Sequence, residues 1–97
     1  MQQKNNKSTY SKNKELLLVS TGKIIRRERN KVGKGINLFS FEYDIGNGLL
    51  SKLENGISDT KITTLWKLAN AFGYSKCSDF IKLIENELPD NFNFYDE

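Results

Sequence analysis

The chain has 97 residues, of which 15 are lysine or arginine, 12 are aspartate or glutamate, one is cysteine and none is histidine. This length suits one domain with a modest core, and the residue set excludes a disulfide, a histidine acid–base pair and the common zinc sites. No stretch is apolar enough for a membrane span or a signal peptide, so we expect a cytoplasmic protein without a metal or cofactor.

The net charge of +3 conceals an uneven distribution along the chain. Residues 1–35 contain ten basic and two acidic residues, a balance of +8. Residues 36–97 contain five basic and ten acidic residues, a balance of −5. The first part would attract a polyanion and the second would repel one, although a solvated charged face explains the same pattern.

The N-terminal third of the chain divides into an arm and a helix. Residues 1–13 are polar and basic with little to bury, which predicts a disordered arm. A helix is predicted from about residue 14 to residue 31, with one face formed by Leu17, Leu18, Thr21, Ile24, Ile25 and Glu28. Gly33 and Gly35 end this helix.

Two short helices follow, at about residues 36–43 and 47–54. The first has Phe39 and Tyr43 one turn apart. Asp44 to Gly46 form the turn between them, because aspartate tolerates a left-handed backbone better than most residues. In the second helix Leu50 and Leu53 point inward, so the opposite face points outward.

The last two predicted helices span about residues 61–72 and 76–88. The apolar stripe of the former is formed by Ile62, Leu65, Trp66, Ala69 and Phe72. We assign Trp66 to the core rather than to a dimer contact, and Cys77 to a buried apolar position. Pro89 ends the last helix. Five helices with almost no strand signal predict an all-α domain over residues 14–88.

Residues 89–97 form an acidic, aromatic tail. Phe92 and Phe94 alternate like a short strand. The cluster of Phe92, Phe94 and Tyr95 has no helix of its own to cover it. We expect it either to fold back on its own domain or to pack against a second protomer, which makes these residues dimer candidates.

Several separate motifs carry a family resemblance between about residues 21 and 74. They are Ile25-Arg26 with Arg29, Phe39-Ser40, the run from Leu50 to Gly56 (LSKLENG), and the run from Thr64 to Gly73 (TLWKLANAFG). In this order and spacing the chain resembles the phage-repressor-like helix-turn-helix domains of the XRE family. The resemblance implies a five-helix, lambda-repressor-like DNA-binding domain.

The resemblance also implies roles for particular residues. Base edges would be read by Asn47, Gly48, Ser51 and Lys52, and phosphates would be contacted by Lys31, Lys34 and Asn55. Asparagine can bond an adenine edge and lysine a guanine edge, whereas Gly46 and Gly48 offer no side chain. Arg29 and Glu54 would form a partly buried ion pair that stabilises the recognition helix.

Three positions depart from the family pattern. Ile36 stands where a glutamine usually contacts phosphate, Asp44 replaces the usual turn glycine, and Thr60 replaces a proline. We expect Arg26 and Arg27 to compensate for the lost phosphate contact electrostatically.

These observations predict sequence-specific binding of duplex DNA by a homodimeric transcriptional regulator that acts as a repressor, with the helix at 47–54 in the major groove. One alternative is an antitoxin-like autoregulator that binds a protein through its C-terminal tail. Another is a protein-interaction module that has lost DNA binding. No phosphate loop, dinucleotide fingerprint or partnered nucleophile is present, so we do not expect an enzyme.

Overall fold

The protein is built from helices, in a computed structural model that describes residues 2–95, with side chains from Lys12 onward. The helices are α1 (Gln2–Val32), α2 (Ile36–Tyr43), α3 (Asn47–Glu54), α4 (Ile62–Ala71) and α5 (Cys77–Glu87). The described residues contain no strand, and the all-α class predicted from the sequence is confirmed.

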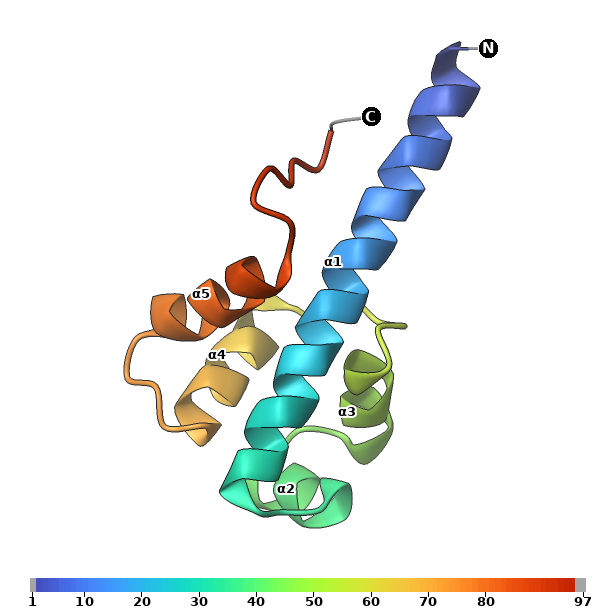
Figure 1. Ribbon diagram of the computed structural model, residues 1–97. Helices are drawn as coiled ribbons and strands as arrows, with labels where there is room; N and C mark the ends of the chain where they lie inside the picture. Colours follow the sequence, from blue (N-terminus) through green and yellow to red (C-terminus); the bar gives the residue numbers. More distant parts are fainter. Residues whose placement is uncertain (1, 96–97) are drawn as a thin grey trace.

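α1 is a long rod against which the other helices are arranged (Figure 1). α3 packs on one side of its C-terminal half and α5 on the other, while α2 lies near its C-terminal end. α4 contacts α2 and α5. The N-terminal half of α1 extends beyond the other helices, and the principal extents of the molecule are 48 × 25 × 20 Å.

The start of α1 differs from the prediction. Residues 1–13 are predicted to form a disordered arm, whereas the structure describes a helix from Gln2 onward. Of these thirteen residues, residue 1 lies outside the described backbone. Once packing fixes the C-terminal half of a helix, each further residue adds a backbone hydrogen bond without a new nucleation step. Glutamine, lysine, asparagine and serine oppose this extension only weakly. A lack of apolar residues therefore does not exclude a helix here.

The buried face of α1 is the one that the helical spacing predicts. Ile24 and Ile25 are completely buried, and the polar side chains of Thr21 and Glu28 lie on the same face. Thr21 donates its hydroxyl hydrogen to the carbonyl oxygen of Leu17, at 2.7 Å. Its hydroxyl is thereby satisfied inside the helix, as a buried polar group requires.

The core lies where α1, α2, α3, α4 and α5 meet. Its most deeply buried large side chains are Phe39, Phe80, Ile24, Ile25, Leu50, Leu53 and Leu68. Ring contacts connect α2 and α5 through the residue that directly follows α4: the centroid of Phe39 lies 5.4 Å from that of Phe72, which lies 5.5 Å from that of Phe80. These contacts fix α2 against α4 and α5, and so fix the position from which α3 starts.

The assignment of Trp66 to the core is wrong. Trp66 is 50% exposed and Ile62, one turn earlier, is 63% exposed. The inward face of α4 is instead centred on Leu68 and Ala69, which are fully buried. Ile62 and Trp66 therefore lie on the exposed edge of the apolar stripe of α4.

The C-terminal tail is also different from the prediction. Residues 89–95 form turns rather than a short strand, because no neighbouring strand is present among the described residues to pair with them. The side-chain amide of Asn13 donates to the carbonyl oxygens of Phe94 (2.9 Å) and Asn93 (3.3 Å), so the tail folds back on α1. Tyr95 remains 77% exposed. Residues 96 and 97 lie outside the described part.

Candidate nucleic-acid interface

α3 has one buried and one exposed face. Leu50 and Leu53 are buried in the core, at 0% and 1% exposure. The expected base-reading residues lie on the other face: Asn47, Gly48 and Lys52 are exposed and Ser51 is half-buried. Within the described residues Lys52 forms no ion pair, so its ammonium group is available to a ligand. The outward face of α3 is therefore accessible but small.

The ion pair that the family resemblance implies, between Arg29 and Glu54, is present. Arg29 Nε donates to Glu54 Oε2 at 2.6 Å and Arg29 Nη2 donates to Oε1 at 2.9 Å. The side chains are 12% and 2% exposed, so Glu54 is not an ordinary surface carboxylate. The hydrogen bonds from Arg29 to Glu54 raise the pKa of the Arg29 guanidinium. This pair joins the end of α3 to α1.

Arg29 also contacts the segment between α1 and α2. Its Nη1 atom donates to the carbonyl oxygen of Lys34 at 2.8 Å. One guanidinium therefore connects α1, the start of the helix-turn-helix and the end of α3. This fixed fork of donors is a property of arginine that lysine lacks.

Arg26 and Asn55, both expected to contact phosphate, are joined to each other in this structure. Arg26 Nη2 donates to Asn55 Oδ1 at 3.0 Å, and Arg26 Nε lies 3.3 Å from Glu54 Oε1. The Arg26 side chain is still 51% exposed. Two guanidinium groups thus share the single carboxylate of Glu54, which leaves a net positive charge beside the end of α3.

The other expected phosphate contacts are also paired with carboxylates. Lys31 Nζ lies 3.1 Å from Glu28 Oε2, and Arg27 lies 3.8 Å from the same atom. Lys34 pairs with Glu42 and donates to the hydroxyl of Tyr43 at 3.3 Å. These cations are partly neutralised within the protein, so a phosphate would have to compete with the carboxylates for them.

The three departures from the family pattern have local explanations. Ile36 is half-buried against the core, which explains an apolar residue at the start of α2. Asp44 adopts the left-handed conformation, with φ of 54°, and its backbone N–H bonds the Ser40 carbonyl. The backbone N–H of Thr60 donates to the Asp59 carboxylate at 2.8 Å, which orders the loop where a proline is expected.

Gly22 and Gly56 set the distance between α1 and α3. Neither was predicted from the sequence to be a site residue. A Cβ atom on Gly22 would lie 2.5 Å from the carbonyl oxygens of Leu53 and Glu54. A Cβ atom on Gly56 would lie 2.9 Å from Val19 Cα, and Gly56 has a φ of 71°. Only glycine permits this approach and this backbone. Sequence spacing could not reveal it, because the contacts are made between helices far apart in the chain.

A hydrogen bond between Tyr74 and Glu28 was not predicted from the sequence. The hydroxyl of Tyr74 donates to Glu28 Oε1 at 2.8 Å, across 46 residues. Burial, and then the hydrogen bond to Glu28, raise the pKa of Tyr74. Glu28 is 4% exposed, and this hydrogen bond helps to satisfy its charge. The contact joins α1 to the segment before α5.

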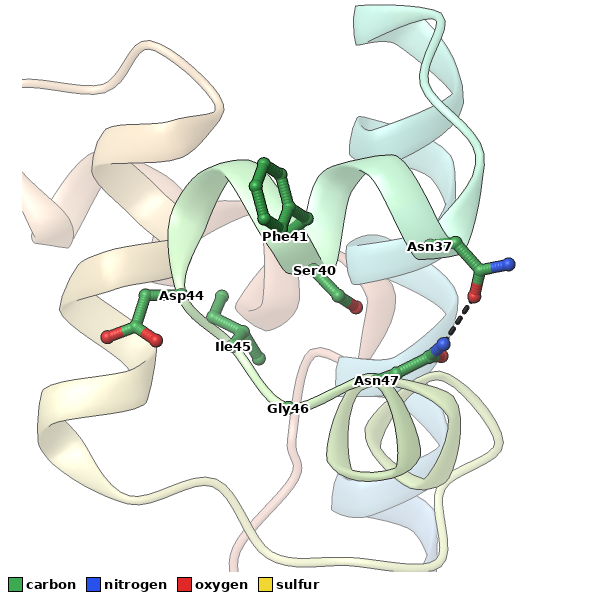
Figure 2. Close-up of a pocket in the computed structure, with 7 residues that line it drawn as sticks. All are labelled: Asn37, Ser40, Phe41, Asp44, Ile45, Gly46 and Asn47. Carbon is green, nitrogen blue, oxygen red and sulfur yellow. Dashed lines mark hydrogen bonds between the residues drawn. The ribbon is translucent and has the colours of Figure 1, made fainter.

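An open groove of about 430 Å³ lies between α2 and the start of α3 (Figure 2). Seven residues line it, namely Asn37, Ser40, Phe41, Asp44, Ile45, Gly46 and Asn47. The side-chain amide of Asn47 donates to Oδ1 of Asn37, and this contact bridges the groove. Asn37 belongs to this surface, although no role was predicted for it from the sequence.

The short helix α3 has an exposed polar face, and a second helix, α2, crosses behind it. This arrangement defines a helix-turn-helix DNA-binding domain. The comparison with known families gives the same result: residues 25–77, more than half of the chain, match the helix-turn-helix family HTH_3. The chain therefore belongs to the XRE-type helix-turn-helix family of DNA-binding transcriptional regulators, with the lambda-repressor-like fold. The searches of curated proteins and of solved structures find no match.

The described residues contain no group of three or more His, Cys, Asp or Glu side chains placed to hold a metal ion. None of their helices combines the length and apolar character needed to cross a membrane.

Proposed function

We propose that this protein recognises a specific sequence in duplex DNA by placing α3 in the major groove. The observation that carries the proposal is the outward face of α3, where Asn47, Ser51 and Lys52 stand opposite the buried Leu50 and Leu53. An asparagine amide complements the adenine edge, and a lysine ammonium can bond the guanine acceptors. Arg26, Arg27, Lys31 and Lys34 supply phosphate contacts in this proposal by exchanging protein carboxylates for phosphate oxygens. Asn55 supplies a further phosphate contact by exchanging its hydrogen bond with Arg26 for one to phosphate.

The test begins with selection of bound duplexes from a random pool, followed by fluorescence anisotropy on the selected site. Asn47→Ala and Lys52→Ala should each weaken specific binding by about 1–3 kcal/mol. Lys82→Ala is the control, because it removes the same charge from an exposed position on α5. Unchanged affinity in a variant carrying both α3 substitutions would exclude α3 as the recognition helix.

We further propose that the protein acts as a homodimeric repressor on a two-fold-related site. Two half-sites about one helical turn apart would suit two copies of α3. Tyr95, together with Trp66 and Ile62, offers exposed apolar surface to a second copy, whereas Phe92 and Phe94 are half-buried against their own chain. Sedimentation of the free protein and of its DNA complex measures the stoichiometry. A single copy on the selected site would contradict the dimer.

A protein-binding role is the second candidate, and the exposed apolar residues favour it. Phe41 is 84% exposed, Ile57 69% and Ile62 63%. An antitoxin-like regulator would bind DNA and a protein partner, whereas a pure interaction module would bind no DNA. The salt dependence of binding to duplex DNA separates these two alternatives, because the affinity of a DNA-binding protein falls steeply with added salt through counterion release. Removal of residues 90–97 should abolish capture of the partner if the tail binds it, with DNA affinity unchanged.

A further inference from the structure

The carboxyl end of α2 is contacted by a lysine from α4. Lys67 Nζ donates to the main-chain carbonyl oxygen of Asp44 at 2.9 Å, across 23 residues of the sequence. The same ammonium lies 3.6 Å from Asp44 Oδ2, but that carboxylate is 99% exposed, so the ion pair should contribute little. The bond to the carbonyl is therefore the contact that joins α4 to the turn of the helix-turn-helix.

The end of α2 favours a cation at this place. The last carbonyl groups of a helix have no partner within the helix, and a positive charge beside them is stabilising. The last turn of α2 contains no basic residue; it carries Glu42, and Asp44 follows it directly. Lys67 supplies, from a neighbouring helix, the positive charge that α2 does not itself carry.

The turn leads directly from this carbonyl into α3. Ile45 and Gly46 connect Asp44 to Asn47, the first residue of α3 (Figure 2). Gly46 has no side chain with which to cap the helix, and its carbonyl oxygen accepts the Leu50 N–H at 2.8 Å. Because so few residues intervene, a displacement of the Asp44 carbonyl changes the direction in which α3 starts.

We propose that Lys67 is a positioning residue for the recognition helix: it holds the carbonyl of Asp44 and so fixes the direction in which α3 meets duplex DNA. The inference rests on the proposed function of α3. Lys67 acts through the turn and needs no contact of its own with DNA. Its side chain is 47% exposed, so loss of the ammonium group should leave the core intact while the start of α3 is held less firmly.

The first experiment measures, by fluorescence anisotropy, the affinity for the selected duplex and for an unrelated duplex. Lys67→Met keeps most of the length of the side chain and removes the ammonium group. The ratio of the two affinities should fall by about two- to fivefold, within the range of one hydrogen bond. Lys82→Met is the matched control, because it removes the same charge from an exposed position on α5 and should leave this ratio unchanged.

Two further variants separate the carbonyl contact from charge alone. Lys67→Arg keeps an N–H donor for the Asp44 carbonyl, so the affinity ratio should stay within about twofold of the original. Asp44→Asn removes the carboxylate but keeps the carbonyl, and asparagine tolerates the left-handed backbone. This variant should also keep the affinity ratio.

Amide hydrogen exchange of the free protein gives a readout that does not depend on DNA. The N–H of Leu50 reports the first turn of α3, and the N–H of Asn55, which bonds the Ser51 carbonyl at 3.1 Å, reports its end. Lys67→Met should speed exchange at Leu50 by about two- to fivefold and leave Asn55 unchanged, because only the start of the helix loses a support. Equal acceleration at both amides would show that Lys67 supports the whole domain, and would overturn the positioning role.

The outcomes distinguish this inference from the proposed function. If Asn47→Ala and Lys52→Ala weaken specific binding while Lys67→Met leaves the affinity ratio unchanged, the positioning role is wrong and α3 remains the recognition helix. An equal loss of ratio in Lys67→Arg and Lys67→Met would also overturn the positioning role. If the original protein binds no duplex DNA, both proposals are wrong, whatever the exchange at Leu50 shows.

Discussion

The two ends of α3 differ in how closely the rest of the protein approaches them. At the C-terminal end, the carbonyl groups of Leu53 and Glu54 lie against Gly22, and Glu54 is bonded to two arginines. At the N-terminal end, a Cβ atom on Gly48 would meet nothing within 4 Å. One end is fixed against α1 while the other is open to solvent, so substitutions at the two ends should have different consequences.

The largest loss of stability is expected from Gly22→Val. Its side chain would occupy the space of two backbone carbonyl groups, which cannot rotate away. We expect a loss of about 3 kcal/mol or more in the free energy of unfolding, at or above the upper range for overpacking. Urea unfolding measures the loss. A loss below that of an average surface substitution would show that α1 and α3 can separate without cost.

Glu54→Gln should have the next largest effect. It removes one charge of a pair whose side chains are 12% and 2% exposed, and leaves Arg29 uncompensated. We expect a loss of about 3 kcal/mol in the free energy of unfolding. Glu42→Gln is the matched control, because its pair with Lys34 is exposed and should contribute much less. Similar losses for both variants would contradict a special role for the end of α3.

Tyr74→Phe should cost about 1.5 kcal/mol at neutral pH, because it removes a hydrogen bond to a buried carboxylate. The pKa of Tyr74 is raised in the folded state, so the unfolded chain loses this proton first as the pH rises above about 10. The stabilisation by Tyr74 should then decline with increasing pH, and the difference from Tyr74→Phe should shrink.

Unfolding in urea across this pH range measures the decline, with Tyr95→Phe as an exposed control. A constant difference between the original protein and Tyr74→Phe above pH 10 would contradict the raised pKa.

The smallest effect is expected at the open end of α3. Gly48→Ala adds a methyl group in free space to a helical residue, and should stabilise the domain by about 0.5 kcal/mol. Thermal unfolding measures the gain. A loss of stability would show that something does pack against the N-terminal end of α3, and the contrast between its two ends would disappear.

Much of the fold could be predicted from the sequence because it depends on local patterns. The bounds of α2 and α3 agree with the prediction, since glycine and aspartate mark the turns on either side. Trp66 was wrongly assigned to the core. An apolar stripe shows which residues share a helix face, but it does not show how much of that face a neighbouring helix covers. The start of α1 was missed because residues 2–13 show no apolar period in the sequence.

The candidate site was predictable only where a family pattern exists. The pairing of Arg29 with Glu54 came from the resemblance, and no local spacing would indicate it. Gly22, Asn37 and Tyr74 were missed because each acts through a partner that is distant in the sequence. Their roles depend on how the helices cross, and a single sequence carries no direct signal of those crossings.

Cys77 provides a means of following these effects without denaturant. It is the one cysteine in the chain, it is 2% exposed, and burial raises the pKa of its thiol. A thiol reagent should reach it only when α5 moves away from the core, so the rate of mass increase reports how often the native domain opens. The protein thus contains its own internal probe of opening, a single native thiol whose modification needs no engineered site.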